Sequence, residues 1–246
     1  DIEPGMALKA LARFADVIAL TAEDSRKFFK TGQNMQVTGY PTRADLVCEN
    51  RVEAMEHFHL QPGLPVLLVI GGSKGAHTIN LAVKENLPDL LEICQVVHIT
   101  GKPDFEELQQ FSYSLTPELA QRYHPYPYLY EEISKAFSCA DLAISRAGAS
   151  TLGEFPLFGL PAILVPYPYA WRYQKVNADY LVNHGAALTI ENQDLSRELL
   201  PAVQNLLSNK DKLAEMKARM SALSTPGPAK NIANLLLALA QEERNR

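Results

Sequence analysis

Cysteine is scarce in this sequence. Only Cys48, Cys94 and Cys139 occur among its 246 residues, and they lie far apart along the chain. Small secreted domains that depend on disulfides are dense in cysteine, so this class of protein is excluded. We expect the thiols to be reduced, which favours a cytoplasmic location.

Long apolar runs and an excess of positive charge are also missing. The longest apolar run, residues 235–240, is far below the roughly 20 residues that a membrane-spanning helix needs. No signal peptide is visible in the sequence. The net charge is −5 and no long basic run occurs, so nucleic acid is not an expected partner.

Several metal-binding and catalytic motifs are absent. The six histidines are scattered, and His57 and His59 have no third metal ligand at a suitable spacing. There is no closely spaced cysteine pair, no H-E-x-x-H motif and no G-x-S-x-G motif. The sequence therefore predicts no metal site, and no cofactor is evident.

The sequence does contain a regular alternation of strands and helices. Short, fully apolar runs separated by helical patterns are typical of a parallel sheet covered by helices on both faces. Hydrophobic residues make up 47% of the chain, enough for a sizeable core. We predict a Rossmann-like α/β fold with strands at residues 66–70, 96–100, 142–145, 162–165 and 187–190.

The first 42 residues precede this alternation. A helix is predicted from Pro4 to about residue 14, with short strands at 17–20 and 35–37. These elements are typical of the end of an α/β domain, and because residue 1 is Asp rather than Met, we expect the chain to begin inside a larger protein. The predicted organisation is 1–42, end of an amino-terminal domain; 43–63, linker; 64–224, ligand-binding domain; 225–246, a helix returning to the amino-terminal domain.

A glycine-rich segment follows the first strand of the predicted sheet, at the end where ligands of such sheets bind. It reads Gly-Gly-Ser-Lys-Gly-Ala, residues 71–76, and leads into a helix expected to reach about residue 91. Glycine lets the backbone approach a ligand closely, and the free N–H groups of a helix start suit a diphosphate. The alternative interpretation is a tight strand-to-helix turn without a ligand.

A second segment, residues 145–154, also joins a strand to a helix start. Its sequence is Ser-Arg-Ala-Gly-Ala-Ser-Thr-Leu-Gly-Glu, and its small residues and hydroxyls could hold the same diphosphate. Glu154, about one and a half turns into the helix, could accept hydrogen bonds from both hydroxyls of a ribose. Alternatively, Glu154 only interacts favourably with the helix dipole.

Two further segments follow strands. Gln174 and Asn177 lie on one face of a predicted helix, where amides can bind sugar hydroxyls. Residues 123–130 are rich in proline and tyrosine and lead into a predicted helix; within them, at residues 126–130, an apolar side chain could cover a base while the backbone reads its edge. The alternatives are ordinary surface amides at Gln174 and Asn177, and a proline-stiffened connection with aromatic packing at residues 126–130.

The order of these four segments resembles the carboxyl-terminal half of the MurG family of glycosyltransferases, over nearly the whole chain. The family's GGSxGA loop corresponds to residues 71–76 and its Thr-Gly-Asn-Pro-x-Arg segment to residues 38–43. Its Arg-x-Gly-Ala-x-Thr-x-x-Glu motif corresponds to residues 146–154, and its amide-bearing helix start to residues 173–177. The sequence departs from the usual family residues at Tyr40, Leu129 and Tyr173.

The resemblance implies a two-domain GT-B fold in which this half holds the donor, UDP-GlcNAc. It implies a set of donor-contacting residues spread over the four segments: Asp1, Arg43, Ser73, Leu129, Tyr130, Ala149, Ser150, Thr151, Glu154, Gln174 and Asn177. Asp1 falls where the family commonly has an Asn near the donor.

The same resemblance implies a role for each group of residues. The hydroxyl-bearing loops and Arg43 would hold the diphosphate, and Glu154 would hold the ribose. Leu129 would pack on uracil while the backbone of Tyr130 reads its edge. The two amides, Gln174 and Asn177, would face the GlcNAc.

The reaction that the resemblance implies is transfer of GlcNAc, with inversion, to the lipid-linked acceptor lipid I, which gives lipid II in peptidoglycan synthesis. The general base is expected in the amino-terminal half, so this half alone should bind UDP-GlcNAc weakly and not turn it over. A divalent cation would act only together with the diphosphate. The implied location is the cytoplasmic face of the plasma membrane, contacted through the amino-terminal domain.

Three alternatives share this architecture. A diacylglycerol glycosyltransferase would use a different acceptor. A UDP-GlcNAc 2-epimerase would need acid and base side chains in the cleft, which we cannot place in this sequence. A non-catalytic donor-binding subunit would resemble one half of the split transferase of dolichol-linked glycan synthesis, although residues 1–42 argue for a fused amino-terminal domain.

Overall fold

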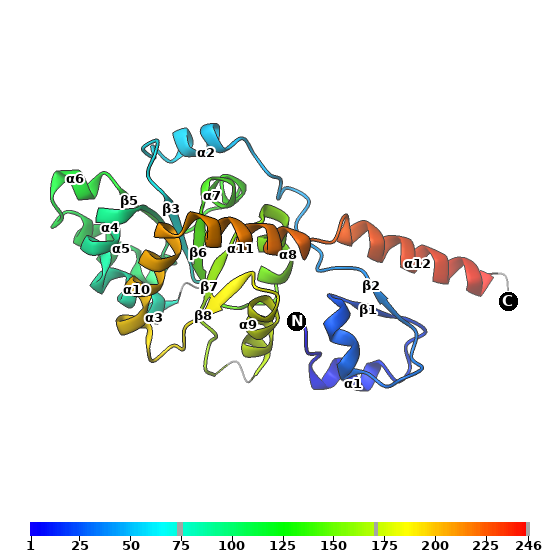
Figure 1. Ribbon diagram of the computed structural model, residues 1–246. Coiled ribbons are helices and arrows are strands. Elements are labelled where there is room, and N and C mark those ends of the chain that lie inside the picture. Colours follow the sequence, from blue (N-terminus) through cyan, green and yellow to red (C-terminus); the bar gives the residue numbers. More distant parts are fainter. Residues whose placement is uncertain (73–75, 170–171, 245–246) are drawn as a thin grey trace.

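The main sheet is parallel throughout and has six strands in the order β5-β4-β3-β6-β7-β8 (Figure 1). The computed structural model describes residues 1–72, 76–169 and 172–244. Within them, the strands of this sheet are β3 (Val66–Ile70), β4 (Gln95–Ile99), β5 (Tyr123–Tyr126), β6 (Leu142–Ser145), β7 (Ala162–Leu164) and β8 (Ala187–Thr189).

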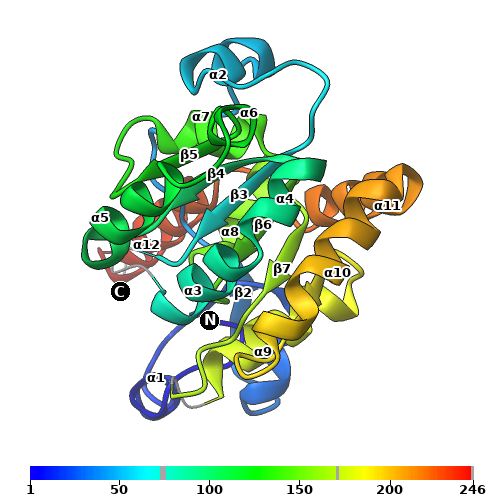
Figure 2. The ribbon, with the colours of Figure 1, turned by 90° about the vertical axis from the view of Figure 1, so that its left-hand side faces the viewer.

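Helices cover both faces of the sheet, as predicted (Figures 1 and 2). Alternate residues of β3 enter two apolar clusters, Val66 and Leu68 on one face and Leu67 and Val69 on the other, so the whole strand is apolar. The first face is covered by α2 (Arg51–His57), α7 (Ile133–Cys139), α8 (Thr151–Phe158) and α9 (Tyr173–Asn183). The second face is covered by α3 (His77–Glu85), α4 (Leu87–Ile93), α10 (Leu195–Ser208) and much of α11 (Lys210–Ala222).

Strand β5 is an element that the sequence analysis missed. No strand was predicted within residues 123–130, which are rich in proline and tyrosine, but residues 123–126 pair with β4. The strand lies at the edge of the sheet, where Pro125 does not interrupt a ladder on both sides. Before it, α5 (Lys102–Ser112) and the short α6 (Pro117–Ala120) connect β4 to β5.

The helix predicted to run to about residue 91 is two helices. Helix α3 ends at Glu85, and α4 begins at Leu87 with Asn86 between them. Pro88 lies in the first turn of α4, where its missing N–H group costs nothing, whereas within a continuous helix it would break a hydrogen bond. The sequence therefore contained the reason for the break.

Residues 1–42 form a small unit beside the main sheet (Figure 1). It contains α1 (Met6–Leu11), the 3₁₀ helix η1 (Glu23–Phe28), and a parallel pair of strands, β1 (Ile18–Leu20) and β2 (Met35–Val37). Helix α12 (Pro228–Arg244) starts beside β2, where the Asn231 amide donates to the Thr38 carbonyl oxygen at 3.2 Å. None of the helices within the described ranges combines the length and apolar character that crossing a membrane requires.

Candidate functional site

The two glycine-containing loops predicted to share a ligand begin side by side. Strand β3 pairs with β6, and Ile70 lies opposite Ser145 at their carboxyl ends. Gly72 has a φ of +88°, a conformation that residues with a Cβ rarely adopt. Ser73 lies outside the described residues. Strand pairing therefore places the starts of both loops at one edge of the sheet, as predicted, and a shared diphosphate remains a prediction.

The loop after β6 ends in a helix start with free donors. The Thr151 hydroxyl and backbone N–H both donate to the Gly148 carbonyl oxygen, at 2.6 and 3.2 Å, which closes a tight turn. Within the described part of the chain, the backbone N–H groups of Ala149 and Ser150 have no hydrogen-bond partner. Unpaired N–H groups at the positive end of a helix dipole favour an anion.

A cavity of about 210 Å³ opens beside these loops. Four of the predicted site residues line it together with Gly72: Arg43, Leu129, Ser150 and Glu154. Apolar residues, among them Ile70, Ile99 and Phe137, form much of the remaining wall. The volume is below the roughly 300–1,000 Å³ of typical ligand pockets, so a large ligand would extend beyond it towards the two loops.

Glu154 faces this cavity and is partly buried. Burial raises the pKa of its carboxyl group, while a hydrogen bond with the Ser150 side chain and the positive charge of Arg43 act in the opposite direction. An ionised carboxylate offers two acceptor oxygens, which matches the two adjacent hydroxyls of a pentose.

Arg43 and Tyr130 contact each other across the mouth of the cavity. The Arg43 guanidinium donates to the Tyr130 carbonyl oxygen at 3.3 Å and lies 3.4 Å from the Asp45 carboxylate. The Tyr130 N–H donates to the Glu132 carboxylate at 3.1 Å. Both backbone groups predicted to read a base are therefore engaged within the protein, and a base would have to replace these partners. Leu129 beside them is buried.

The two predicted sugar-binding amides differ in their surroundings. The Gln174 side-chain oxygen accepts from the Tyr167 N–H at 2.8 Å. Asn177 is fully buried, and its amide accepts from the Ile2 N–H at 2.9 Å and donates to the Asp1 carboxylate at 2.7 Å and the Ala147 carbonyl oxygen at 3.1 Å. Asn177 thus ties the start of the chain to the loop after β6, and its hydrogen-bonding capacity is largely used.

Arg146 is a further residue at this edge, which the sequence analysis treated only as part of a motif. Its guanidinium donates to the Val165 carbonyl oxygen, the Asn192 amide oxygen and the Thr78 hydroxyl, and lies 5.3 Å from the centre of the Tyr167 ring. Burial lowers the pKa of Arg146, but a guanidinium remains charged at neutral pH. Among the residues that the structure describes, no carboxylate pairs with it. An arginine directly after a strand was the signal that could have identified it.

Metal-ligating side chains do not gather in the described residues: no group of three or more His, Cys, Asp or Glu there could hold a metal ion. The polar groups around the cavity and the start of α8 include N–H donors, the Ser150 hydroxyl, the Arg43 guanidinium and the Glu154 carboxylate. Such a set suits an anionic ligand that also carries hydroxyls.

Comparison with known proteins assigns the same segments to a sugar-transfer family. The family model described as Glycosyltransferase family 28 C-terminal domain matches residues 66–233. A UDP-N-acetylglucosamine--N-acetylmuramyl-(pentapeptide) pyrophosphoryl-undecaprenol N-acetylglucosamine transferase from Roseiflexus sp. (strain RS-1) is 36% identical, over 96% of this chain and 62% of the relative. The relative of the same name from Desulforamulus reducens is 38% identical, over 91% of this chain and 61% of its own length.

A solved structure gives a similar result. The crystal structure of Acinetobacter baumannii MurG matches 97% of this chain and 65% of its own chain, with a TM-score of 0.76 and 26% identity. The chain thus spans less than two thirds of the length of these relatives.

Proposed function

We propose that this chain, which belongs to the glycosyltransferase family 28 C-terminal domain family, binds the donor UDP-GlcNAc. Within that family it belongs to the MurG family. The complete enzyme would transfer GlcNAc to lipid I and so form lipid II. The observation that carries the proposal is the cavity at the carboxyl edge, where Arg43, Leu129, Ser150 and Glu154 meet beside the two loops.

The chemistry of the cavity supports a nucleoside diphosphate. Uracil would pack against Leu129, and the two ribose hydroxyls would donate to Glu154. The diphosphate would then lie at the start of α8, where the Ala149 and Ser150 N–H groups have no partner within the described residues and Thr151 is the first helical residue. By resemblance to the family, Ser73 would also contact the diphosphate. Gln174 and Asn177 would lie towards the sugar, beside Asp1.

Charge stabilisation is the contribution that this domain would make to transfer. When the acceptor hydroxyl attacks the anomeric carbon with inversion, the bond to UDP breaks and negative charge grows on the leaving diphosphate. Helix-start N–H groups and the Arg43 guanidinium are placed before the reaction, so they stabilise that charge without reorganisation. The general base would come from the amino-terminal domain, at the cytoplasmic face of the membrane where lipid I is available. A divalent cation, if used, would accompany the diphosphate.

Titration calorimetry on the 246-residue chain tests donor binding. UDP and UDP-GlcNAc should bind, and GDP should bind more weakly, because the edge of guanine offers the Tyr130 backbone a different set of donors and acceptors from that of uracil. A folded chain that binds GDP as tightly as UDP would contradict the proposal. In a transfer assay with lipid I, this chain alone should form no lipid II, and robust transfer would place the general base in this half.

A further inference from the structure

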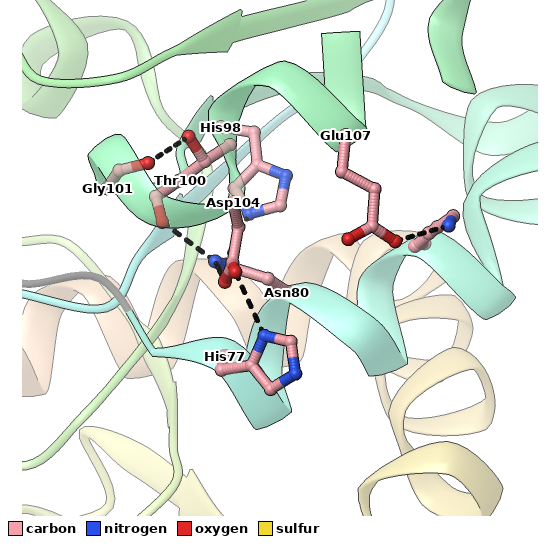
Figure 3. A network of polar contacts seen from close by, with 8 residues as sticks. His77, Asn80, His98, Thr100, Gly101, Asp104 and Glu107 are labelled. Atoms are coloured by element: carbon pink, nitrogen blue, oxygen red, sulfur yellow. Dashed lines mark hydrogen bonds and ion pairs between the residues drawn. The ribbon is translucent and has the colours of Figure 1, made fainter. Parts of the chain in front are cut away.

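A network of buried polar groups lies beside the start of α3 (Figure 3). At its centre is His98 of β4, which is fully buried between the Tyr123 hydroxyl and the Asn80 amide oxygen, each 3.0 Å away. An amide oxygen only accepts hydrogen bonds, so Nε2 of His98 must carry the proton and Nδ1 must accept from Tyr123. Burial lowers the pKa of His98 to about 3, which keeps the ring neutral.

Asn80 links this buried network to helix α5. Its amide nitrogen donates to the Thr100 carbonyl oxygen at 2.7 Å and to the Asp104 carboxylate at 2.6 Å. The second oxygen of Asp104 lies 3.0 Å from Nδ1 of His77. One carboxylate in the first turn of α5 therefore holds two residues of α3: His77, its first residue, and Asn80, which lies almost one turn further along (Figure 3).

The first turn of α3 is also held from its other side. The Thr78 hydroxyl donates to the Asn192 amide oxygen at 2.8 Å and accepts from the Arg146 guanidinium at 2.6 Å. Three residues among the first four of α3 thus have their side chains held: His77 and Asn80 by Asp104, and Thr78 by Asn192 and Arg146. This helix directly follows the 71–76 loop, so its orientation sets the direction of the N–H groups at its start.

We propose that Asp104 is a positioning residue for the donor diphosphate: through Asn80 and His77 it holds the first turn of α3 in the orientation that binds phosphate. This inference rests on the proposed donor-binding function and adds to it a residue that contacts no ligand. Preorganised donors bind an anion better than donors that must be ordered on binding.

The sign of the expected effect separates positioning from simple electrostatics. Asp104 is negatively charged and contacts His77, the first residue of α3 after the 71–76 loop, so its charge by itself repels a diphosphate bound at that loop. If charge were its only influence, Asp104→Ala would strengthen UDP binding. If Asp104 positions α3, the same variant weakens UDP binding although it removes a repulsive charge.

The test compares four proteins in titrations with UDP and with uridine, which has no phosphate. Asp104→Ala should lose about tenfold in UDP affinity, the size expected for losing a hydrogen bond to a charged group, and change little for uridine. Asp104→Asn should restore near wild-type affinity, because an amide can accept from Asn80 and donate to His77. Glu107→Ala is the matched control, since Glu107 lies on α5 and forms one exposed ion pair, with Lys84 at 2.7 Å, and its removal should not weaken UDP binding.

His77→Ala gives a second measurement in case Asp104→Ala does not fold. The His77 side chain is 64% exposed, so its removal leaves the buried network intact. His77→Ala should therefore weaken UDP binding by a smaller factor than Asp104→Ala does. Unchanged or stronger UDP binding by both folded variants, or an equal loss for uridine, would overturn the positioning role. If the wild-type chain binds no UDP at all, the proposed donor-binding function itself fails, which is a distinct outcome.

Discussion

Among single residues, Glu154 offers the most specific test of how the cavity recognises its ligand. Glu154→Gln should lower UDP affinity by about tenfold, because an amide presents only one acceptor oxygen to two ribose hydroxyls. It should also remove the preference for UDP over 2′-deoxy-UDP. Glu131→Gln is the control, because this substitution removes an equal charge from an exposed residue that directly follows Tyr130 in the chain. An undiminished preference for UDP in Glu154→Gln would contradict the ribose contact.

Acidification should reproduce the Glu154→Gln effect in the unmodified chain. Burial raises the pKa of Glu154, so this carboxyl group takes up a proton at a higher pH than an exposed glutamate does. The protonated group has lost part of its acceptor capacity, and uridine affinity should therefore fall as the pH is lowered through that raised pKa. Uridine carries no phosphate that titrates in this range. The fall should be absent in Glu154→Gln.

At the level of secondary structure, the approach of α8 to the segment leading to Arg43 depends on Gly153. A Cβ at this position would lie 2.9 Å from the Tyr40 carbonyl oxygen and 3.0 Å from Thr42 Cγ2. Alanine normally stabilises a helix interior relative to glycine, but a backbone oxygen cannot move aside as a flexible side chain can. The glycine is therefore required for α8 and residues 40–42 to pack together.

Gly153→Ala should lower the free energy of unfolding by roughly 1–3 kcal/mol, the usual cost of overpacking, and should weaken UDP binding by displacing Arg43. Chemical denaturation and titration with UDP measure the two effects. Gly148→Ala is the matched stability control, because a Cβ there has no neighbour within 4 Å and its φ is not positive. Equal stability of the two variants would show that α8 can shift without cost.

For the whole molecule, two histidines on the edge half of the sheet, the buried His98 and the half-buried His124, should make stability depend on pH in acid. Burial lowers the pKa of His98 to about 3 and that of His124 to about 4. In the unfolded chain both take up a proton near pH 6.5, so the unfolded state binds more protons below that pH. The free energy of unfolding should fall by about 1.4 kcal/mol per pH unit for each histidine as the pH drops from about 6.5 towards 4.

Urea denaturation at a series of pH values measures this slope. His124→Gln removes one of the two histidines that take up a proton on unfolding, so their contribution to the slope in this variant should be about half as steep over the same interval. A variant lacking His124 with the full slope would show that this ring is not held neutral by the fold.

Much of the fold and part of the site could be predicted from local patterns. The strand at residues 66–70 is apolar throughout and that at 142–145 is apolar up to its last residue, because both faces are covered, and their predicted limits match β3 and β6. The match to the family motifs identified the segments that carry Arg43, Ser150 and Glu154. The break at Asn86 was also within reach, since Pro88 excludes a continuous helix.

By itself, then, the sequence determined five of the six strands of the main sheet and most of its helices, because these depend on periodicity and on neighbours in the chain. Only the tertiary structure decided which segments distant in the sequence are in contact. Strand pairing brings residues 70 and 145 together, an edge position accommodates Pro125, and long-range hydrogen bonds commit Asn177 to the Asp1–Ile2 segment and Asn80 to Asp104. Such contacts are selected by packing between distant segments, which no local pattern encodes.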